Sequence, residues 1–279
     1  MLKSALVKVS LKEPPGRVVE MLAALRSFGT QEAHLVHVRT SASRAFPEKK
    51  RARLERLREK AEALGLMADV HILQGHVPTL VLQAAWQLDA DYIAIAWVHK
   101  AVLRQALLGS IDADIVRMSD SPVFIFKRRF LGRSENLDSV LYATDFQATD
   151  RKVMPYLKNK GFQARMLYML HVGDRAPDPA TDKTRRKEVL ANLRRLANDC
   201  AHAYESVETL EAMGPVGRTI VKTAKATGVD LIIVGKVDHP DMFKKLTGSV
   251  ADQLPHRSPC SVFIIPGYTP DRDAGKGGA

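Results

Sequence analysis

The feature that most constrains this chain is an internal repeat near the end of each half. Residues 91–126 and 230–265 align at one constant offset without a gap. In both, an apolar run is followed by a loop, a Gly-Ser pair (Gly109-Ser110 and Gly248-Ser249), a helical pattern and a second apolar run. Continuous apolar runs bounded by glycine and charge are typical of parallel strands covered on both faces. Agreement over a whole strand–loop–helix–strand unit predicts two copies of one domain.

Each half alternates predicted strands and helices. The first half is expected to have strands at residues 5–10, 33–38, 70–73, 92–96 and 123–126, and helices at 18–27, 48–64 and 79–88. The second half is expected to have strands at 140–144, 164–172, 207–212, 231–234 and 261–265, helices at 150–158, 185–206 and 217–227, and a surface loop at 174–183. The helices after the two Gly-Ser pairs complete the pattern, and the second of them is expected to stop near Pro255. This alternation predicts an α/β fold with two tandem, doubly wound, open parallel sheets of five strands each.

The length of the chain fits this division. With 279 residues, each half is close to the common domain length of about 100–150 residues. The expected domains are residues 1–128 and 137–267, separated by a polar, basic linker. The small, polar residues 268–279 are expected to form a disordered tail.

The formal net charge of +11 has its densest source in KKRARLERLREK, residues 49–60. Glu55 and Glu59 are interleaved there at helical spacing, which is typical of a solvated helix face; a basic docking surface for a protein partner is the alternative. No nucleic-acid motif or aromatic stacking cluster accompanies the segment, so a nucleic-acid partner is not expected.

The location is predicted from what the sequence does not contain. No apolar run approaches the roughly 18 residues that a membrane-crossing helix needs, so no membrane insertion is expected. The N-terminus has no leader pattern, and Cys200 and Cys260 form no disulfide framework. We therefore expect a cytoplasmic protein.

Three loops of the second half follow predicted strands: Thr144-Asp145-Phe146, His171-Val172-Gly173 and Gly235-Lys236-Val237-Asp238. Ligands of open α/β sheets bind at this carboxyl edge. Asp145 is expected to accept a hydrogen bond from a base amine or ribose hydroxyl, and Gly235 to allow a sugar or phosphate to approach the backbone. The N–H groups that follow Gly248, together with Ser249, are suited to phosphate. The pattern predicts a nucleotide site in the second copy; a tight strand–helix turn is the alternative.

The first half lacks most of these groups. Ser10 replaces the aspartate, Ala96 replaces the glycine that follows the fourth strand, and only Gly109-Ser110 is kept. Trp97 comes next to Ala96, where a packed aromatic side chain and a ring that blocks the pocket are the two alternatives. This copy is expected to bind no nucleotide and to serve as scaffold or in partner recognition.

No catalytic residue and no metal site are predicted. His37 and His171 end matching strands, and no carboxylate or nucleophile is paired with either by position, so a packing or hydrogen-bonding role is expected. His239 beside Asp238 has the ligand types for a metal, but an exposed loop pair is the expected interpretation.

Four segments of the second half, LDSVLYATDFQATD, MLYMLHV, MGPVGRTIVKTAKATGVDLIIVGK and LTGSVADQLPHRSPCSVFII, resemble the signature segments of the universal stress protein domain. The resemblance covers essentially the whole second copy and, more weakly, the first. It implies a parallel sheet of the adenine-nucleotide alpha hydrolase type, which in many members binds ATP or AMP at its carboxyl edge. It also implies that the last strands, near residues 123–126 and 262–265, pair as an internal pseudo-dimer and cover two sheet edges.

Carried over residue by residue, the resemblance implies that Asp145 contacts adenine or ribose and that Val172 packs on the base. The other implied pocket residues are Ala143, Thr144, Val234, Gly235, Gly248, Ser249 and Val250. Asp238 stands where nucleotide-binding members have their second glycine. A carboxylate about 4 Å from a phosphate costs ~1 kcal/mol or more, so adenosine or AMP is favoured over ATP.

The function predicted from these features is a non-enzymatic stress-response regulator of the universal stress protein type. Nucleotide binding in the second copy would shift a conformational population and change the affinity for an unknown protein partner. Two alternatives stay open: a nucleotide-independent module that docks through the basic helix, and a slow ATPase or other adenine-nucleotide enzyme. The first strand ends without the Gly-His loop that a nucleotidyltransferase needs. A homodimer of whole chains also stays open.

Overall fold

The computed structural model describes residues 1–40, 46–97, 111–127, 137–147, 149–159, 161–173, 178–236 and 250–267. The first half contains β1 (Ser4–Lys8), α1 (Pro15–Arg26), β2 (Glu32–Arg39), α2 (Glu48–Ala63), β3 (Met67–Gln74), α3 (Val77–Gln87), β4 (Tyr92–Ala96), α4 (Ile111–Met118) and β5 (Val123–Phe126). The second half contains β6 (Ser139–Thr144), α5 (Asp150–Lys158), β7 (Met166–Gly173), α6 (Pro179–Cys200), the 3-10 turn η1 (Ala201–Ala203), β8 (Ser206–Met213), α7 (Val216–Thr227), β9 (Leu231–Lys236), α8 (Val250–Arg257) and β10 (Ser261–Pro266). Each predicted strand is present.

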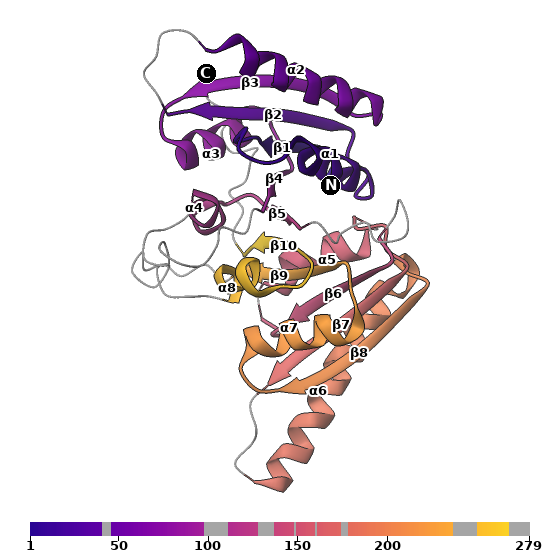
Figure 1. Ribbon diagram of the computed structural model, residues 1–279. Coiled ribbons are helices and arrows are strands. Elements are labelled where there is room, and N and C mark those ends of the chain that lie inside the picture. Colours follow the sequence, from indigo (N-terminus) through magenta and orange to yellow (C-terminus); the bar gives the residue numbers. More distant parts are fainter. Residues whose placement is uncertain are drawn as a thin grey trace, which may run out of the picture.

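The strands of these segments form one continuous sheet in the order β3-β2-β1-β4-β5-β10-β9-β6-β7-β8 (Figure 1). Neighbours are parallel except β5 and β10, which are antiparallel. Each copy contributes five strands in a doubly wound order, so the α/β prediction is confirmed. The two predicted sheets are the halves of one ten-stranded sheet.

Position in the sheet follows the apolar pattern. β4 reads YIAIA and β5 reads VFIF, and every residue of both is buried, since helices cover both faces of the sheet there. The edge strands β3 and β8 contain polar as well as apolar residues, and most of their residues are only partly buried or exposed. The most apolar strands therefore lie in the middle.

Two hydrophobic cores cover the two faces of this sheet. One contains buried residues of α1, α2, α5 and α6, and the other contains buried residues of α3, α4, α7 and α8. Each core includes residues from both halves of the chain. The copies are thus packed together on both sides of the sheet.

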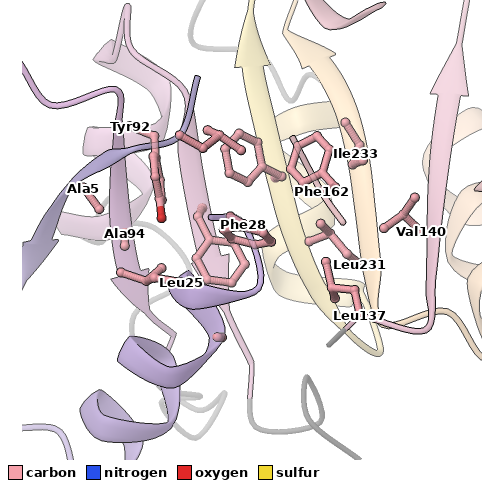
Figure 2. Packing of buried hydrophobic residues seen from close by; sticks show 14 of the residues in the cluster. Ala5, Leu25, Phe28, Tyr92, Ala94, Leu137, Val140, Phe162, Leu231 and Ile233 are labelled. Atoms are coloured by element: carbon pink, nitrogen blue, oxygen red, sulfur yellow. The ribbon is translucent and has the colours of Figure 1, made fainter. Parts of the chain in front are cut away.

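The centre of the sheet is the seam between the copies. Phe124 of β5 lies opposite Phe263 of β10 in antiparallel register, which confirms the expected internal pseudo-dimer. Phe28 and Phe162 occupy equivalent places after α1 and α5, and their ring centroids are 5.7 Å apart in an edge-on arrangement (Figure 2). Phe28 lies 4.9 Å from Phe124, and Phe162 lies 4.9 Å from Phe263. Edge-on aromatic pairs add about 0.5–1.5 kcal/mol each beyond burial, so the aromatic cluster stabilises the seam.

Two buried lysines also cross the seam. Lys236, at the end of β9, donates to three carbonyl oxygens at the C-terminal end of α4, at 2.7–3.4 Å. Lys127, just after β5, donates to the carbonyl oxygen of Ser258, just after α8, at 2.6 Å. Burial lowers the pKa of Lys127 to about 8. A cation is favourable at a helix C-terminus, so each copy caps a helix of the other.

The predicted loop at residues 174–183 is wrong in its second part, because α6 begins at Pro179. A carboxylate oxygen of Asp178 accepts from the backbone N–H groups of Ala180 and Thr181, which is an N-cap, and proline suits the first helical turn. The same helix was predicted to reach residue 206 but ends at Cys200. Its first half is largely exposed and extends past the sheet (Figure 1).

One prediction near the repeat stretch is also wrong. β9 does not end before Gly235 but continues to Lys236, because its last residues pair with Ile265 and Pro266 of β10. α8 ends at Arg257, close to the predicted stop, and contains Pro255 at the cost of one backbone hydrogen bond. The predicted linker, the tail at 268–279 and both Gly-Ser pairs lie outside the described residues.

Candidate functional site

The candidate nucleotide site lies where β6, β7 and β9 end. β6 is between the other two, and all three are parallel, so their carboxyl ends meet at one edge of the sheet. Ala143 is in register with Val234, and Thr144 with His171. This is the edge at which ligands of open α/β sheets bind.

The apolar candidates come together on the face that α7 and α8 cover. Ala143, Val172 and Val250 are partly buried, and all three pack against the core that contains Val234 and Ala251. Val250 is also the first residue of α8. These side chains form an apolar lining next to the strand ends, which suits the face of a planar base.

The turn after β6 positions the polar candidates. Asp145 is exposed, and its Oδ1 accepts from the N–H of Gln147 at 2.9 Å and from the hydroxyl of Thr149 at 3.2 Å. Within the described residues, its Oδ2 accepts no hydrogen bond, so that oxygen is available to a ligand. The hydroxyl of Thr144 accepts from the N–H of Phe146 at 3.0 Å and therefore helps to shape the turn.

A buried polar network lies below this turn, and the sequence reasoning missed it. The carboxylate of Asp150 accepts hydrogen bonds from the hydroxyls of Tyr142 and Thr144, the latter at 2.7 Å. Burial raises the pKa of Asp150, against the effect of these two donors. Burial, followed by the charge of Asp150, raises the pKa of Tyr142. Asp150 was predicted only as the start of a helix, and its hydroxyl partners are visible only once β6 and α5 are packed.

Gly235 was predicted to be a glycine because a ligand approaches it. In the structure a β-carbon at this position would lie 2.7 Å from the Cβ of Thr149 and 3.2 Å from its hydroxyl oxygen. Real β-carbons essentially never come that close to another atom. The contact between β9 and the start of α5 therefore requires this glycine by itself.

Gly235→Ala is expected to destabilise the protein by about 1–3 kcal/mol, because the new methyl group overlaps Thr149. Urea unfolding measures the change, and the Thr149→Gly background should recover part of it in a double-mutant cycle. Gly217→Ala is the matched control, since a β-carbon there meets nothing nearer than 3.7 Å. Equal stability of the two alanine variants would contradict the steric explanation.

The equivalent place in the first copy is filled by an ion pair. Lys8 aligns with Ala143 in both sequence and strand register, and Asp112 of α4 aligns with Ala251 of α8 in sequence. The ammonium group of Lys8 donates to Oδ1 of Asp112 at 2.7 Å, with Glu13 3.9 Å away. Lys8 is only 6% exposed. The sequence analysis did not predict this ion pair, although a position-by-position comparison of the two copies shows it: two opposite charges in the first copy stand where the second copy has two alanines.

The ring of Trp97 packs across the seam between the two copies, so Trp97 is not by itself what fills the pocket position of the first copy. It is 7% exposed, and its ring lies edge-on to His256 of α8, with centroids 4.9 Å apart. The packed aromatic is therefore the alternative that is observed.

His37 and His171 each form a hydrogen bond through Nδ1 with a carbonyl oxygen at a strand end. The partners are Val9, at 2.7 Å, and Thr144, at 3.1 Å, which agrees with the expected hydrogen-bonding role.

Three further points concern what the described residues contain. Among them, no group of three His, Cys, Asp or Glu side chains is placed to hold a metal ion. No helix in the described segments is long and apolar enough to cross a membrane. Asp238, His239, Gly248 and Ser249 lie outside the described residues, and their roles stay predictions.

Comparison with known proteins identifies the relatives of this chain. The model of the universal stress protein family matches residues 1–127 and again residues 136–266. A universal stress protein from Archaeoglobus fulgidus DSM 4304 superposes with a TM-score of 0.72 at 22% identity, over 95% of this chain and 96% of that one. A putative universal stress protein from Pseudomonas aeruginosa UCBPP-PA14 gives 0.71 at 16% identity, over 95% and 93%. At these identities the structures establish the fold alone.

A curated relative is named as a stress response protein. The stress response protein NhaX of Bacillus subtilis (strain 168) is 29% identical over 90 residues, which is 32% of this chain. The match spans about half of that relative, 52% of its length. Because the family model matches both halves of the sequence and the fold agrees throughout, the chain belongs to the universal stress protein family and carries two of its domains in tandem.

Proposed function

We propose that this protein is a non-enzymatic stress-response regulator of the cytoplasm whose second copy binds one adenine nucleotide. The nucleotide lies at the carboxyl edge of β6, β7 and β9, with its base on Val172 and its ribose at Asp145. Binding shifts the population of conformations around the site and changes the affinity for a protein partner. The first copy serves as a scaffold that holds the second in place.

The observation that carries this proposal is the difference between the two copies at one position. In the first copy, the ion pair of the buried Lys8 and the partly buried Asp112 occupies the place beside the strand ends. In the second copy the aligned residues are the partly buried Ala143 and the buried Ala251, and we propose that a ligand takes the space that the two longer side chains fill in the first copy. The Oδ2 of Asp145, which accepts no hydrogen bond from the described residues, adds a charged acceptor for a ribose hydroxyl, whereas Ser10 of the first copy has no carboxylate.

The proposed ligand is AMP in preference to ATP. Asp238 replaces a glycine in the segment that the family resemblance assigns to the phosphates. Each additional phosphate charge near that carboxylate costs about 1 kcal/mol at 4 Å in water, so the monophosphate is favoured.

Native mass spectrometry and calorimetric titration with ATP, ADP and AMP test the proposal. We expect one nucleotide per chain, and at least about tenfold weaker binding in Asp145→Asn, since a hydrogen bond to a charged acceptor contributes about 1.5–3 kcal/mol. Asparagine keeps the oxygen that orders the turn. Ser10→Ala, at the equivalent position of the first copy, is the control and should bind as the wild type does. No binding at millimolar nucleotide would refute the proposal, and two nucleotides per chain would show that the first copy is misjudged.

The interaction-module alternative rests on α2. Arg58 pairs with Glu55 and Glu62 on the same helix, which is the solvated-face arrangement. Five other basic residues of α2 are exposed: Lys49, Lys50, Arg51, Arg56 and Lys60. Partner capture that is weakened by salt, lost on neutralising these five and unaffected by Asp145→Asn would favour this alternative. Steady release of ADP in the same samples would favour the enzyme alternative.

A further inference from the structure

A cavity of about 900 Å³ lies between α5 and α6, on the face of the sheet opposite the candidate nucleotide pocket. It is lined by Phe146, Gln147, Asp150, Arg151, Met154, Pro155, Lys158, Asn159, Arg195 and Leu196. The volume is within the roughly 300–1,000 Å³ of small-molecule sites. The proposed function uses none of these residues, and only the turn after β6 is common to both places.

The first copy has a smaller cavity in the equivalent place. It is about 330 Å³ and is lined by Pro15, Arg53, Arg56, Leu57 and Lys60, between α1 and α2. Arg56-Leu57 aligns with Arg195-Leu196, because the buried Leu54 and Leu193 match at the same offset. Both copies therefore have an arginine-edged hollow between their first two helices, and only that of the second copy is large.

The wall of the larger cavity has an apolar part and a cationic part. Met154 and Leu196 are 7% and 5% exposed and belong to the core on this face. Phe146, with a positive φ of 60°, stacks its ring on His171 at 4.4 Å and closes one side. A ligand that fills the cavity would thus find apolar surface on the floor and on one side.

The cationic part of the wall contains more positive than negative side chains. Lys158 is neutralised by Asp199 at 2.7 Å. Arg151 and Arg195 are exposed, and within the described residues neither makes a hydrogen bond or a salt bridge. Among the described lining residues, Asp150 is the one carboxylate, and its oxygens already accept from two hydroxyl groups. The charge of Arg195 also acts on Asp150 and Asp199, but neither guanidinium group is in direct contact with a carboxylate of the described residues. Both can therefore hydrogen-bond an acidic ligand, and guanidinium is the preferred partner of carboxylate, sulfonate and phosphate groups.

We propose that the α5–α6 cavity is a second ligand site, which takes a small amphipathic anion. The acidic group of the ligand lies between Arg151 and Arg195, and its apolar body packs on Met154, Leu196 and Phe146. The site does not depend on nucleotide binding in the second copy, so either proposal can fail without the other.

Fluorescence titration of the whole chain with anilinonaphthalene sulfonate, an aromatic anion, tests this site. We expect one probe per chain, and about tenfold or greater loss of affinity in Arg195→Glu, which is about 1.4 kcal/mol or more. Arg56→Glu is the matched control, since it reverses an exposed arginine at the equivalent place of the smaller hollow, and less than a twofold change is expected. Unchanged thermal unfolding of both variants shows that the fold is kept.

Competition then separates the kinds of occupant. Decanoate should displace the probe, and decanol, of the same length but uncharged, should displace it at least about tenfold less well. AMP should not displace it. Equal effects of the two arginine variants, or equal displacement by decanol, would overturn the proposal. Displacement by a glutamate-rich peptide but not by decanoate would also overturn it, in favour of docking by an acidic chain segment.

Discussion

A chain with both Ala143→Lys and Ala251→Asp is expected to bind no adenine nucleotide. These substitutions move the ion pair of the first copy, Lys8 with Asp112, into the second copy at the aligned positions. Ala143 and Val172 both pack against the core that contains Val234, beside the strand ends, so a lysine side chain at position 143 is expected to fill the proposed pocket. Isothermal titration with AMP should show loss of affinity beyond the measurable range, at least about a hundredfold or ~2.7 kcal/mol.

The double substitution is needed because a single lysine would be buried without a partner, at a cost of about 3–5 kcal/mol. Cooperative urea unfolding of the double variant shows that it folds. The matched control is Lys8→Ala with Asp112→Ala, which removes the pair from the first copy and should leave AMP affinity of the second unchanged. Wild-type affinity in the transplanted variant would place the nucleotide elsewhere.

Lys236→Met is expected to lower the free energy of unfolding by about 2–4 kcal/mol. The ammonium group is buried and donates to the carbonyl oxygens of Val116, Arg117 and Ser119 at 3.4, 3.1 and 2.7 Å. Methionine keeps the length of the side chain but leaves these oxygens at the end of α4 without a cation. Because the contact joins the two copies, the loss acts on the seam and not on one copy alone.

Urea unfolding at neutral pH measures this loss, and hydrogen exchange of the α4 amides locates it. Lys222→Met is the control, because Lys222 is exposed on α7, and its effect should be within about 0.5 kcal/mol. If both lysine variants unfold at the same urea concentration, the cap across the seam contributes nothing. Faster exchange in α4 with unchanged exchange in α7 is the pattern that supports it.

The strands could be predicted from the sequence because their apolar runs are local. β4 was predicted at its observed bounds, Tyr92–Ala96, since it begins directly after Asp91 and an unbroken apolar run has few other structures open to it. Helix ends were less certain. Asp178-Pro179 is a readable helix start, yet the proline and aspartate content of residues 174–183 made the segment resemble a loop. β9 extends to Lys236 only because β10 pairs with it there.

The candidate site also has features that could be predicted from the sequence and features that could not. Asp145 follows β6, and Val172 and Val234 lie near the ends of β7 and β9. They could be chosen from the strand pattern together with the family resemblance, because parallel strands end at one edge. The steric reason why position 235 must be glycine could not be predicted, since the neighbouring Thr149 lies at the start of α5, far away in the chain. The α5–α6 cavity was also not predicted, because it depends on how two helices of different length lie on one face.

The sequence by itself determined the two copies, their α/β fold and the place of the candidate site, because repeats and hydrophobic periodicity are properties of neighbouring residues. Only the tertiary structure decided how the copies are joined and which side chains meet beside the strand ends of the first copy. Lys8 reaches Asp112 across 104 residues, and Lys236 reaches Ser119 across 117. Such pairs depend on the order of strands in the sheet and on the close packing of the helices, and no local pattern specifies which distant charge or carbonyl group a buried side chain meets.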